Sequence, residues 1–425
     1  MEASSKTNEQ NWMRKFIPIW SAQIFSLLGS GLVQFALVWW ITQKTGSAAL
    51  LATATLVAVL PEVLLAPFAG ALVDRWNRRK VMIYADAVIA LFTLALAVLF
   101  AFDLVQVWHI FVVMFLRSVG GLFHWPAMQA STSLMVPEQH FSRVAGINQA
   151  LRGSLNIIAP PLGALLMSVL KFYQVISIDV ITAIIAISPL LFIHIPQPVR
   201  TDSAEMITPK ALFKDMAEGF RYMKTWKGLI YLLLIAAVLN FLLSPAGTLS
   251  PLIVTQVFKK GVWELSLLDS IMGVGVVVGG LLLGVWGGFK SKIFTSLSGV
   301  VGLGFGVLLF GIVPDNMFWA AVVAMGLLGF MNPMANGPLQ AIMQARVPAE
   351  MQGRVMGVTS SICTAMMPLS MMIAAPVAEF LGLRVWYWLG GALVMLIGLA
   401  AFFVPSIRAL EEGPSQISAA VVTVE

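Results

Sequence analysis

Residues 16–42 read FIPIWSAQIFSLLGSGLVQFALVWWIT and contain no charged side chain. A helix that crosses the hydrocarbon core of a bilayer needs about 20 consecutive, mostly apolar residues. The stretch therefore predicts a membrane-spanning helix. It is longer than the apolar region of a cleavable signal peptide, which covers roughly 7–15 residues, so we expect it to remain in the protein.

The whole chain has the same character. Of its 425 residues, 59% are hydrophobic and only 11% are charged, and the mean hydropathy is +0.89. Soluble domains carry about 25% charged residues, so the composition excludes a soluble, disordered or fibrous protein. Because lipid offers no hydrogen bonds and the alternating strands of a barrel are absent, we expect an all-α integral membrane protein. Twelve membrane-spanning helices are expected at approximately 16–42, 47–73, 81–102, 104–127, 144–170, 173–195, 228–257, 266–289, 292–313, 317–338, 355–380 and 384–406.

The longest polar stretch, Pro196 to Lys227, divides these spans into two sets of six. Its second part, Pro209 to Lys227, places apolar residues at helical spacing between charged ones and predicts an amphipathic helix. The expected parts are an N-terminal six-helix half (1–195), a cytoplasmic linker with the amphipathic helix (196–227), a C-terminal six-helix half (228–406) and a cytoplasmic tail (407–425).

The distribution of Lys and Arg predicts the orientation in the membrane. Of the 26 such residues, 19 lie in segments on the side of the N-terminus, 5 lie in the opposite loops, and Arg117 and Arg152 lie inside spans. Loops rich in these residues stay in the cytoplasm, so we expect both termini there and the protein in the cytoplasmic membrane. The same bias accounts for the net charge of +6 without a nucleic-acid partner.

The two halves also share a sequence repeat. Seven residues in the loops after spans four and ten recur 211 positions apart, and in the first half they are Gln129, Ala130, Val136, Pro137, Arg143, Val144 and Gly146. Because six spans separate the copies, both lie on the same side of the membrane. We therefore expect two pseudo-symmetric halves related by an axis along the membrane normal, the arrangement of the major facilitator transporters.

The loop after span two reads GALVDRWNRRK over residues 70–80. It resembles the major facilitator loop signature Gly-x-x-x-Asp-Arg-x-Gly-Arg-Arg/Lys, with Asn77 at the second glycine, where Asn tolerates a left-handed turn. The resemblance implies a charge latch that closes the inner gate, and the alternative is a cluster that serves only the positive-inside bias. The residues of this expected gate loop are Gly70, Asp74, Arg75, Arg78 and Arg79.

Two further segments resemble family signatures. Arg117 in span four begins the pattern Arg-x-x-x-Gly, which the resemblance associates with proton coupling, while the alternative is a structural ion pair. Span five reads APPLGA over residues 159–164, a variant of the signature Gly-Pro-x-x-Gly-Gly, whose carriers are mostly antiporters. The alternative is a proline kink with small residues for close packing. The expected motif residues are Ala159, Pro160, Pro161 and Gly163.

Glu62 is the carboxylate that we expect near the middle of the membrane, about 18 Å from the inner end of span two at 1.5 Å per residue. A buried carboxylate favours its neutral form, so Glu62 can load a proton on one side and release it on the other. We expect Arg117 or Arg152 to be its counter-charge, and the alternatives are a structural pair or a position at the lipid interface. Asp86 and Asp179, in the supporting spans three and six, are expected to form structural pairs with arginines.

Polar and bulky apolar residues in the candidate cavity-lining spans predict a site for large ligands. The 23 methionines add adaptable surface that suits varied ligands, and the alternative for each side chain is core packing or contact with lipid. The expected cavity residues are Gln23, Gln34, Phe35, Trp39, Asn148, Asn240, Phe241, Asn332 and Asn336.

Several activities lack their usual residues. The single cysteine, Cys363, excludes an intrachain disulfide and a cysteine-based metal site. The sequence contains no nucleotide-binding Gly-x-x-x-x-Gly-Lys-Ser/Thr loop, no His-Glu-x-x-His and no Gly-x-Ser-x-Gly. We therefore expect no metal, no cofactor and no enzymatic activity.

The chain as a whole resembles the bacterial macrolide-efflux branch of the major facilitator superfamily, through residues 20–26, 42–48, 70–80, 115–118, 123–127 and 353–355. The resemblance implies a proton-coupled exporter of bulky amphipathic drugs that works by alternating access in the bilayer, and we expect a monomer. The alternatives are an exporter or importer of one dedicated metabolite or siderophore, and a non-transporting sensor or scaffold on the same fold.

Overall fold

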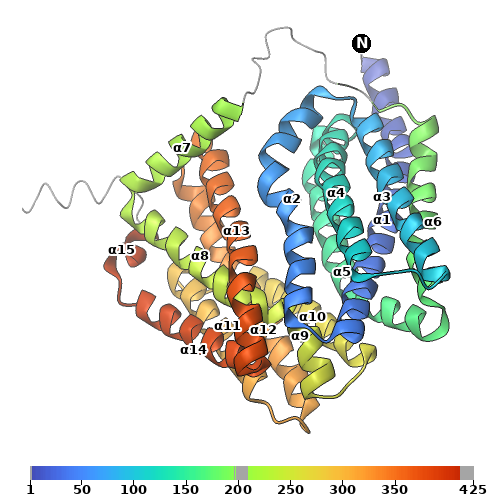
Figure 1. The fold of residues 1–425 in the computed structure, drawn as a ribbon. Coiled ribbons are helices and arrows are strands. Elements are labelled where there is room, and N and C mark those ends of the chain that lie inside the picture. Colours follow the sequence, from blue (N-terminus) through green and yellow to red (C-terminus); the bar gives the residue numbers. More distant parts are fainter. Residues whose placement is uncertain (1, 196, 198–208, 412–425) are drawn as a thin grey trace, which may run out of the picture. The chain divides into compact units, whose positions relative to one another are not determined.

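The computed structural model describes residues 2–195, 197 and 209–411, and these are almost entirely helical (Figure 1). The elements are α1 (Glu2–Thr45), α2 (Ala48–Arg75), α3 (Arg78–Ala101), α4 (Val107–Met135), η1 (Glu138–His140), α5 (Phe141–Val169), α6 (Phe172–Phe192), α7 (Pro209–Thr225), α8 (Lys227–Thr248), α9 (Ser250–Leu252), η2 (Ile253–Val257), α10 (Val262–Trp286), α11 (Lys292–Ile312), α12 (Phe318–Arg346), α13 (Ala349–Leu381), α14 (Leu383–Ala401), α15 (Pro405–Arg408) and η3 (Ala409–Glu411).

Twelve helical segments within the described ranges are long and apolar enough to cross a membrane, which confirms the expected number. The seventh span differs in detail, because α8 ends at Thr248 and the chain continues through α9 and the π-helical turn η2. Pro251 lies at the start of α9 and has no backbone N–H to donate to the preceding turn, so the regular helix is interrupted there.

Local signals fix several helix ends. The side chain of Asn77 accepts a hydrogen bond from the backbone N–H of Lys80 at 3.1 Å and caps α3, and Ser291 caps α11 in the same way. Gly287 ends α10 in the left-handed conformation, with φ 78°. Asn77 itself has φ −67°, so the left-handed turn expected at this position is wrong: the residue serves as a helix cap.

The chain forms two compact units. The first comprises Met1–Lys44 and Thr53–Ile207, and the second comprises Thr45–Ala52 and Thr208–Glu425. In the first unit, α3 packs against α4 and α6. The apolar core at one end of this unit contains Ile19, Val73, Val81, Met82, Ala127, Met128, Leu190 and Ile195.

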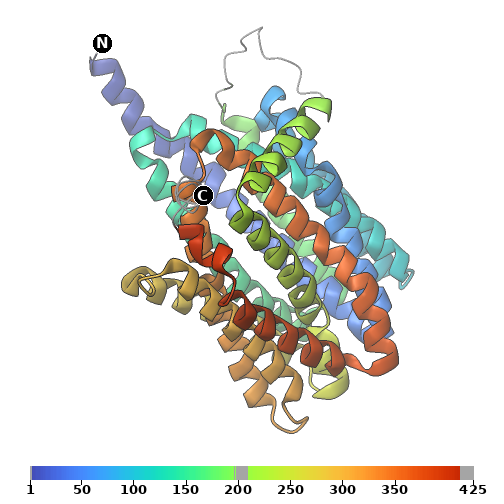
Figure 2. The ribbon, with the colours of Figure 1, turned by 90° about the vertical axis from the view of Figure 1, so that its left-hand side faces the viewer.

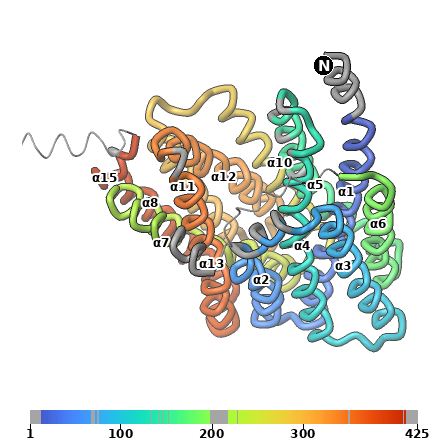
Figure 3. The backbone as a smooth tube through the Cα atoms, turned by 90° about the horizontal axis from the view of Figure 1, so that it is seen from above, coloured from blue at the N-terminus to red at the C-terminus, as the bar shows by residue number. Residues whose placement is uncertain are grey.

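In the second unit, α12 packs against both α10 and α11 (Figures 2 and 3). Glycines allow the close approach of α10 and α12. A Cβ atom on Gly279 would lie 2.2 Å from the carbonyl oxygen of Phe330, and one on Gly275 would lie 2.4 Å from that of Gly326. The small residues in span eight are therefore a packing surface.

The amphipathic helix α7 packs against α13 of the same unit. Arg354 pairs with Glu218 at 2.8 Å, and Met223 is fully buried in the core beneath α7. Burial raises the pKa of the Tyr222 hydroxyl. The side chains of residues 209–216 lie outside the described part of the chain.

The turn between α1 and α2 groups with the second unit, which the expected boundaries did not include. Oε1 of Glu379, on α13, accepts hydrogen bonds from the Ser47 hydroxyl and the Ala49 backbone N–H, each at 3.0 Å. Gln256 donates to the Gly46 carbonyl at 2.6 Å. A carboxylate at the first turn of α2 also complements the helix dipole.

Candidate functional site

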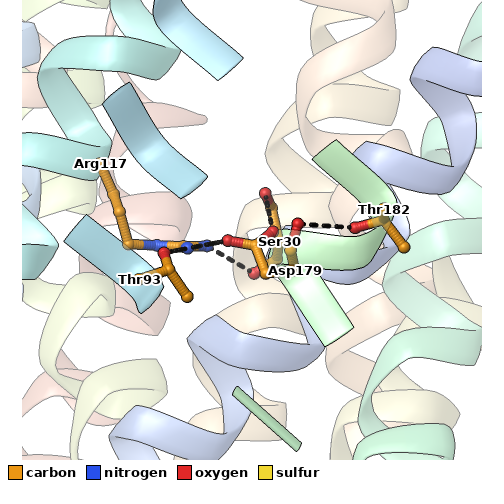
Figure 4. A network of polar contacts seen from close by, with 5 residues as sticks. All are labelled: Ser30, Thr93, Arg117, Asp179 and Thr182. Carbon is orange, nitrogen blue, oxygen red and sulfur yellow. Dashed lines mark hydrogen bonds and ion pairs between the residues drawn. The ribbon is translucent and has the colours of Figure 1, made fainter. Parts of the chain in front are cut away.

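A buried ion pair lies inside the first unit, between Arg117 on α4 and Asp179 on α6 (Figure 4). The Ser30 hydroxyl donates to Oδ1 of Asp179 at 2.8 Å, and the Thr93 hydroxyl donates to Oδ2 at 3.2 Å. The Asp179 side chain is 1% exposed. Because charges in a membrane interior are costly unless paired, this network fixes α1, α3, α4 and α6 relative to one another.

A second buried cluster joins Gln23, Asp86 and His124, from α1, α3 and α4. Nε2 of His124 lies 2.8 Å from Oε1 of Gln23 and 3.4 Å from Oδ1 of Asp86. Nε2 of Gln23 donates to Oδ2 of Asp86 at 3.3 Å and to the Ala186 carbonyl on α6 at 3.4 Å. The amide of Gln23 therefore bridges a carboxylate and an imidazole.

A hollow of about 410 Å³ lies beside these clusters within the first unit. Its polar lining includes Gln34, Asp86, Arg117 and His124, together with serines of α1 and α4. Asp179 does not contribute to it. The hollow has room for several waters, since each needs about 30 Å³ in liquid, and its lining offers the polar partners that water requires.

Two predicted partnerships are wrong. The guanidinium of Arg117 binds Asp179, which makes it unavailable as the expected counter-charge of Glu62. Asp86 faces His124 and Gln23 where an arginine was expected. Glu62 is exposed on α2 and makes no hydrogen bond or ion pair with any described residue.

The side chain of Arg152, the other predicted coupling residue, lies outside what the structure describes. The coupling roles of Glu62 and Arg152 stay predictions.

In the expected gate loop, Arg78 and Arg79 bind carbonyl groups of the first unit. Arg78 is buried and donates to the Ala130 carbonyl on α4 at 2.8 Å, while Arg79 donates to the Leu190 and Leu191 carbonyls on α6. Both side chains thereby tie the start of α3 to neighbouring helices. Gly70, Asp74 and Arg75 belong to the last turns of α2, and the surroundings of their side chains lie outside what the structure describes.

The span-five motif lies where α5 approaches α1. A Cβ atom on Gly163 would lie 2.9 Å from the Phe35 ring, and a Cβ atom on Gly31 would lie 3.3 Å from that of Ala159. Ala159 and Pro160 are buried, and Pro161 is half-buried. The geometry is that of close packing between two helices.

The second unit contains an apolar cavity of about 350 Å³, lined by α8, α11 and α12 and by single residues of α10, α14 and α15. Three predicted residues, Asn240, Asn332 and Asn336, lie on its wall. Asn240 and Asn336 donate their amide N–H groups to carbonyls of their own helices at 2.9 and 3.0 Å. Their carboxamide oxygens accept no hydrogen bond from any described residue.

The other predicted cavity residues lie elsewhere, and two of them bind neighbours. Asn148 accepts a hydrogen bond from the Trp20 indole at 2.6 Å, and Phe241 packs against Trp386 with ring centroids 6.1 Å apart. Gln23, Phe35 and Trp39 are buried and lie outside the linings of both cavities, so their place in a substrate cavity stays a prediction. Only Gln34 lines the hollow of the first unit.

The site residues predicted from the sequence do not include His124, Ser30 and Thr93. A signal was present, because His124 and three ionisable residues occur in spans three, four and six, where isolated charges are costly. Helical spacing alone did not show which of them face one another, since the partners lie on different helices.

The fold and both sites can be compared with known proteins. A family model described as Major Facilitator Superfamily matches residues 19–365. The chain belongs to the Major Facilitator Superfamily. This is a family of transporters, and the twelve apolar helices make the chain a multi-pass membrane protein.

Relatives of this Major Facilitator Superfamily chain include Macrolide efflux protein A of Streptococcus pyogenes. The two are 33% identical over 401 residues, which cover 94% of this chain and 98% of the relative. Multidrug efflux pump Tap of Mycolicibacterium fortuitum is 25% identical over 393 residues, covering 90% and 94%. A crystal structure of the nucleoside transporter NupG superposes with a TM-score of 0.71 at 14% identity, covering 92% and 98%, and supports the fold alone.

Proposed function

We propose that this chain is a secondary active exporter of bulky, amphipathic, macrolide-like drugs, coupled to protons and working by alternating access. The observation that carries the proposal is the apolar cavity of the second unit with its asparagines. The relatives named for macrolide and multidrug efflux, which match nearly the whole chain, support it.

The chemistry of this cavity suits an amphiphile. Leucine, isoleucine, valine and methionine side chains make up most of its lining, so an apolar ligand surface gains about 25 cal/mol for each Å² removed from water. The free carboxamide oxygens of Asn240 and Asn336 accept hydrogen bonds from hydroxyl or ammonium groups. Its volume lies near the lower end of the range of drug sites, about 300–1,000 Å³, so it holds part of a large molecule.

The proposed setting is the cytoplasmic membrane, with both termini in the cytoplasm as the distribution of Lys and Arg indicates. We propose a monomer of two six-helix halves that moves drugs without enzymatic chemistry, using small molecules, protons and the bilayer as its partners. The gradient supplies the energy, since the potential contributes about 2.3 kcal/mol per charge per 100 mV.

Drug accumulation in a pump-deficient bacterium tests this proposal. A panel of macrolides and lipophilic dyes is measured with wild type, with Asn240→Ala and Asn336→Ala, and with Asn316→Ala as a matched control in an exposed loop. We expect wild type to lower accumulation several-fold, a protonophore to abolish the effect, and the two cavity variants to weaken it while the control does not.

Accumulation that is unchanged for every compound contradicts drug export and favours a dedicated metabolite, a siderophore or a non-transporting role. Export that survives the protonophore contradicts proton coupling. Glu62→Gln belongs in the same panel, because loss of export in this variant supports its predicted part in coupling, and full export removes it from the mechanism.

A further inference from the structure

The cluster of Gln23, Asp86 and His124 contains two titratable groups that the ion pair of Arg117 does not use. The carboxamide oxygen of Gln23 can only accept, so Nε2 of His124, 2.8 Å away, carries a proton. That proton also faces Oδ1 of Asp86 at 3.4 Å. Both side chains are buried, with 7% and 5% exposure. A carboxylate and an imidazole thus face each other across one proton.

The described charges around the hollow do not balance without an additional proton. Arg117 is paired with Asp179, so among the described ionisable side chains that line the hollow the carboxylate of Asp86 is left facing only His124. A net charge inside a membrane protein is costly, so one more proton on the pair of Asp86 and His124 restores neutrality. Histidine is the side chain whose charge ordinarily changes between pH 5 and 8.

The described groups that α1, α2, α4 and α6 bring near the pair are neutral, or are charges held elsewhere. Helix α1 contributes Gln23 and serines, which are neutral. Helix α6 contributes the Ala186 carbonyl, and its Asp179 is already ion-paired. Helix α4 adds Arg117, which Asp179 holds. Helix α2 contributes Ala58 to the hollow. The same helix carries Glu62, which contacts no described charged residue.

The carboxylates of Asp86 and Asp179 differ in their access to the hollow. Asp86 and His124 both line the hollow of about 410 Å³, where water can deliver or remove a proton. Asp179 is outside this lining and accepts hydrogen bonds from Ser30 and Thr93 in addition to its ion pair. Proton exchange at Asp86 and His124 therefore leaves the structural pair intact.

We propose that the pair of Asp86 and His124 is the proton-exchange site of the first unit, and that the transported drugs are amphiphiles bearing a protonated amine. This inference rests on the proposed function. When the pair releases its proton to water in the hollow, one negative charge is left, and a cationic drug in the transporter compensates it. Exchange of one proton for one monovalent cation conserves the total charge around this pair.

The test uses the full chain in proteoliposomes with a radiolabelled macrolide that carries a tertiary amine. Two readouts are compared, which are uptake driven by an acidic vesicle interior and counterflow without a gradient. We expect Asp86→Asn and His124→Gln to reduce gradient-driven uptake at least ten-fold while counterflow stays within two-fold of wild type. Asp103→Asn, the same change at an exposed carboxylate in the α3–α4 turn, is expected to leave both unchanged.

Gradient-driven uptake that persists in both variants overturns the assignment of Asp86 and His124. Wild type that shows counterflow but ignores the gradient overturns proton coupling itself, which distinguishes failure of the proposed function from failure of the site. Loss of both activities in both variants indicates a structural role and also overturns the assignment.

Binding to detergent-solubilised protein gives an independent measurement. Between pH 5 and 8 we expect the wild-type affinity for the same macrolide to change at least five-fold more than that of Asp86→Asn. Protonation of the drug affects both measurements equally. The difference between the two pH profiles therefore reports the protonation of the protein. Equal pH profiles for wild type and variant contradict the proposal.

Discussion

Removing the carboxylate of Asp179 is the sharpest test of how the first unit is held together. Asp179→Ala leaves the guanidinium of Arg117 buried and without its ion-pair partner. Breaking a buried pair in this way costs about 3–5 kcal/mol. Two hydroxyl groups, of Ser30 and Thr93, lose an acceptor as well, and each such bond contributes about 1 kcal/mol.

Thermal unfolding in detergent, followed by the fluorescence of the 13 tryptophans, measures the effect. One kcal/mol shifts Tm by about 2–4 °C in a unit of 150–250 residues, so the ion-pair loss predicts a fall of about 6–20 °C. The double variant Asp179→Leu with Arg117→Met removes both charges and keeps an apolar side chain at each position. We expect it to regain at least half of the loss, because replacing a whole buried pair by apolar residues is often close to neutral.

A double-mutant cycle completes this test. Arg117→Met and Asp179→Leu are also measured singly, and contacting residues in one network should couple by about 0.5–3 kcal/mol. If the effects of the two single variants simply add in the double variant, the pair is not an energetic unit and the reasoning is refuted.

Three further predictions concern packing and helix ends. Glu379→Ala removes the acceptor at the first turn of α2, so amide hydrogen exchange at Ala49 should become at least ten-fold faster, and an unchanged rate would contradict the contact. Gly279→Val places a side chain against the Phe330 carbonyl oxygen, from which even a Cβ atom would lie only 2.2 Å away. We expect this variant to lower Tm by several degrees. Equal melting curves for wild type and variant would argue against close packing of α10 on α12. Arg79→Ala removes two hydrogen bonds to carbonyls at the end of α6 and should increase protease sensitivity between α2 and α3, and wild-type sensitivity would show that these bonds contribute little.

The spans could be predicted because lipid imposes a simple requirement on each segment by itself. A run such as residues 16–42 satisfies its backbone internally only as a helix, whatever the rest of the chain does. Asn240, Asn332 and Asn336 lie on the wall of the apolar cavity, because polar residues in apolar spans usually face a cavity or another helix, and their role in substrate binding stays a prediction. Gln23 is also a polar residue in an apolar span, but it lies in the buried cluster with Asp86 and His124. Polarity alone therefore does not distinguish a residue that lines a cavity from one that is hydrogen-bonded between helices.

The sequence by itself determined that the chain is a bundle of membrane helices, because length and apolar content are properties of one segment. Only the tertiary structure decided that Arg117 faces Asp179 and that His124 faces Asp86, with Glu62 bound by neither. These partners are 62 and 38 positions apart in the sequence and lie on different helices. Helical periodicity gives the faces of one helix, whereas the pairing of faces depends on how several helices rotate and pack against one another.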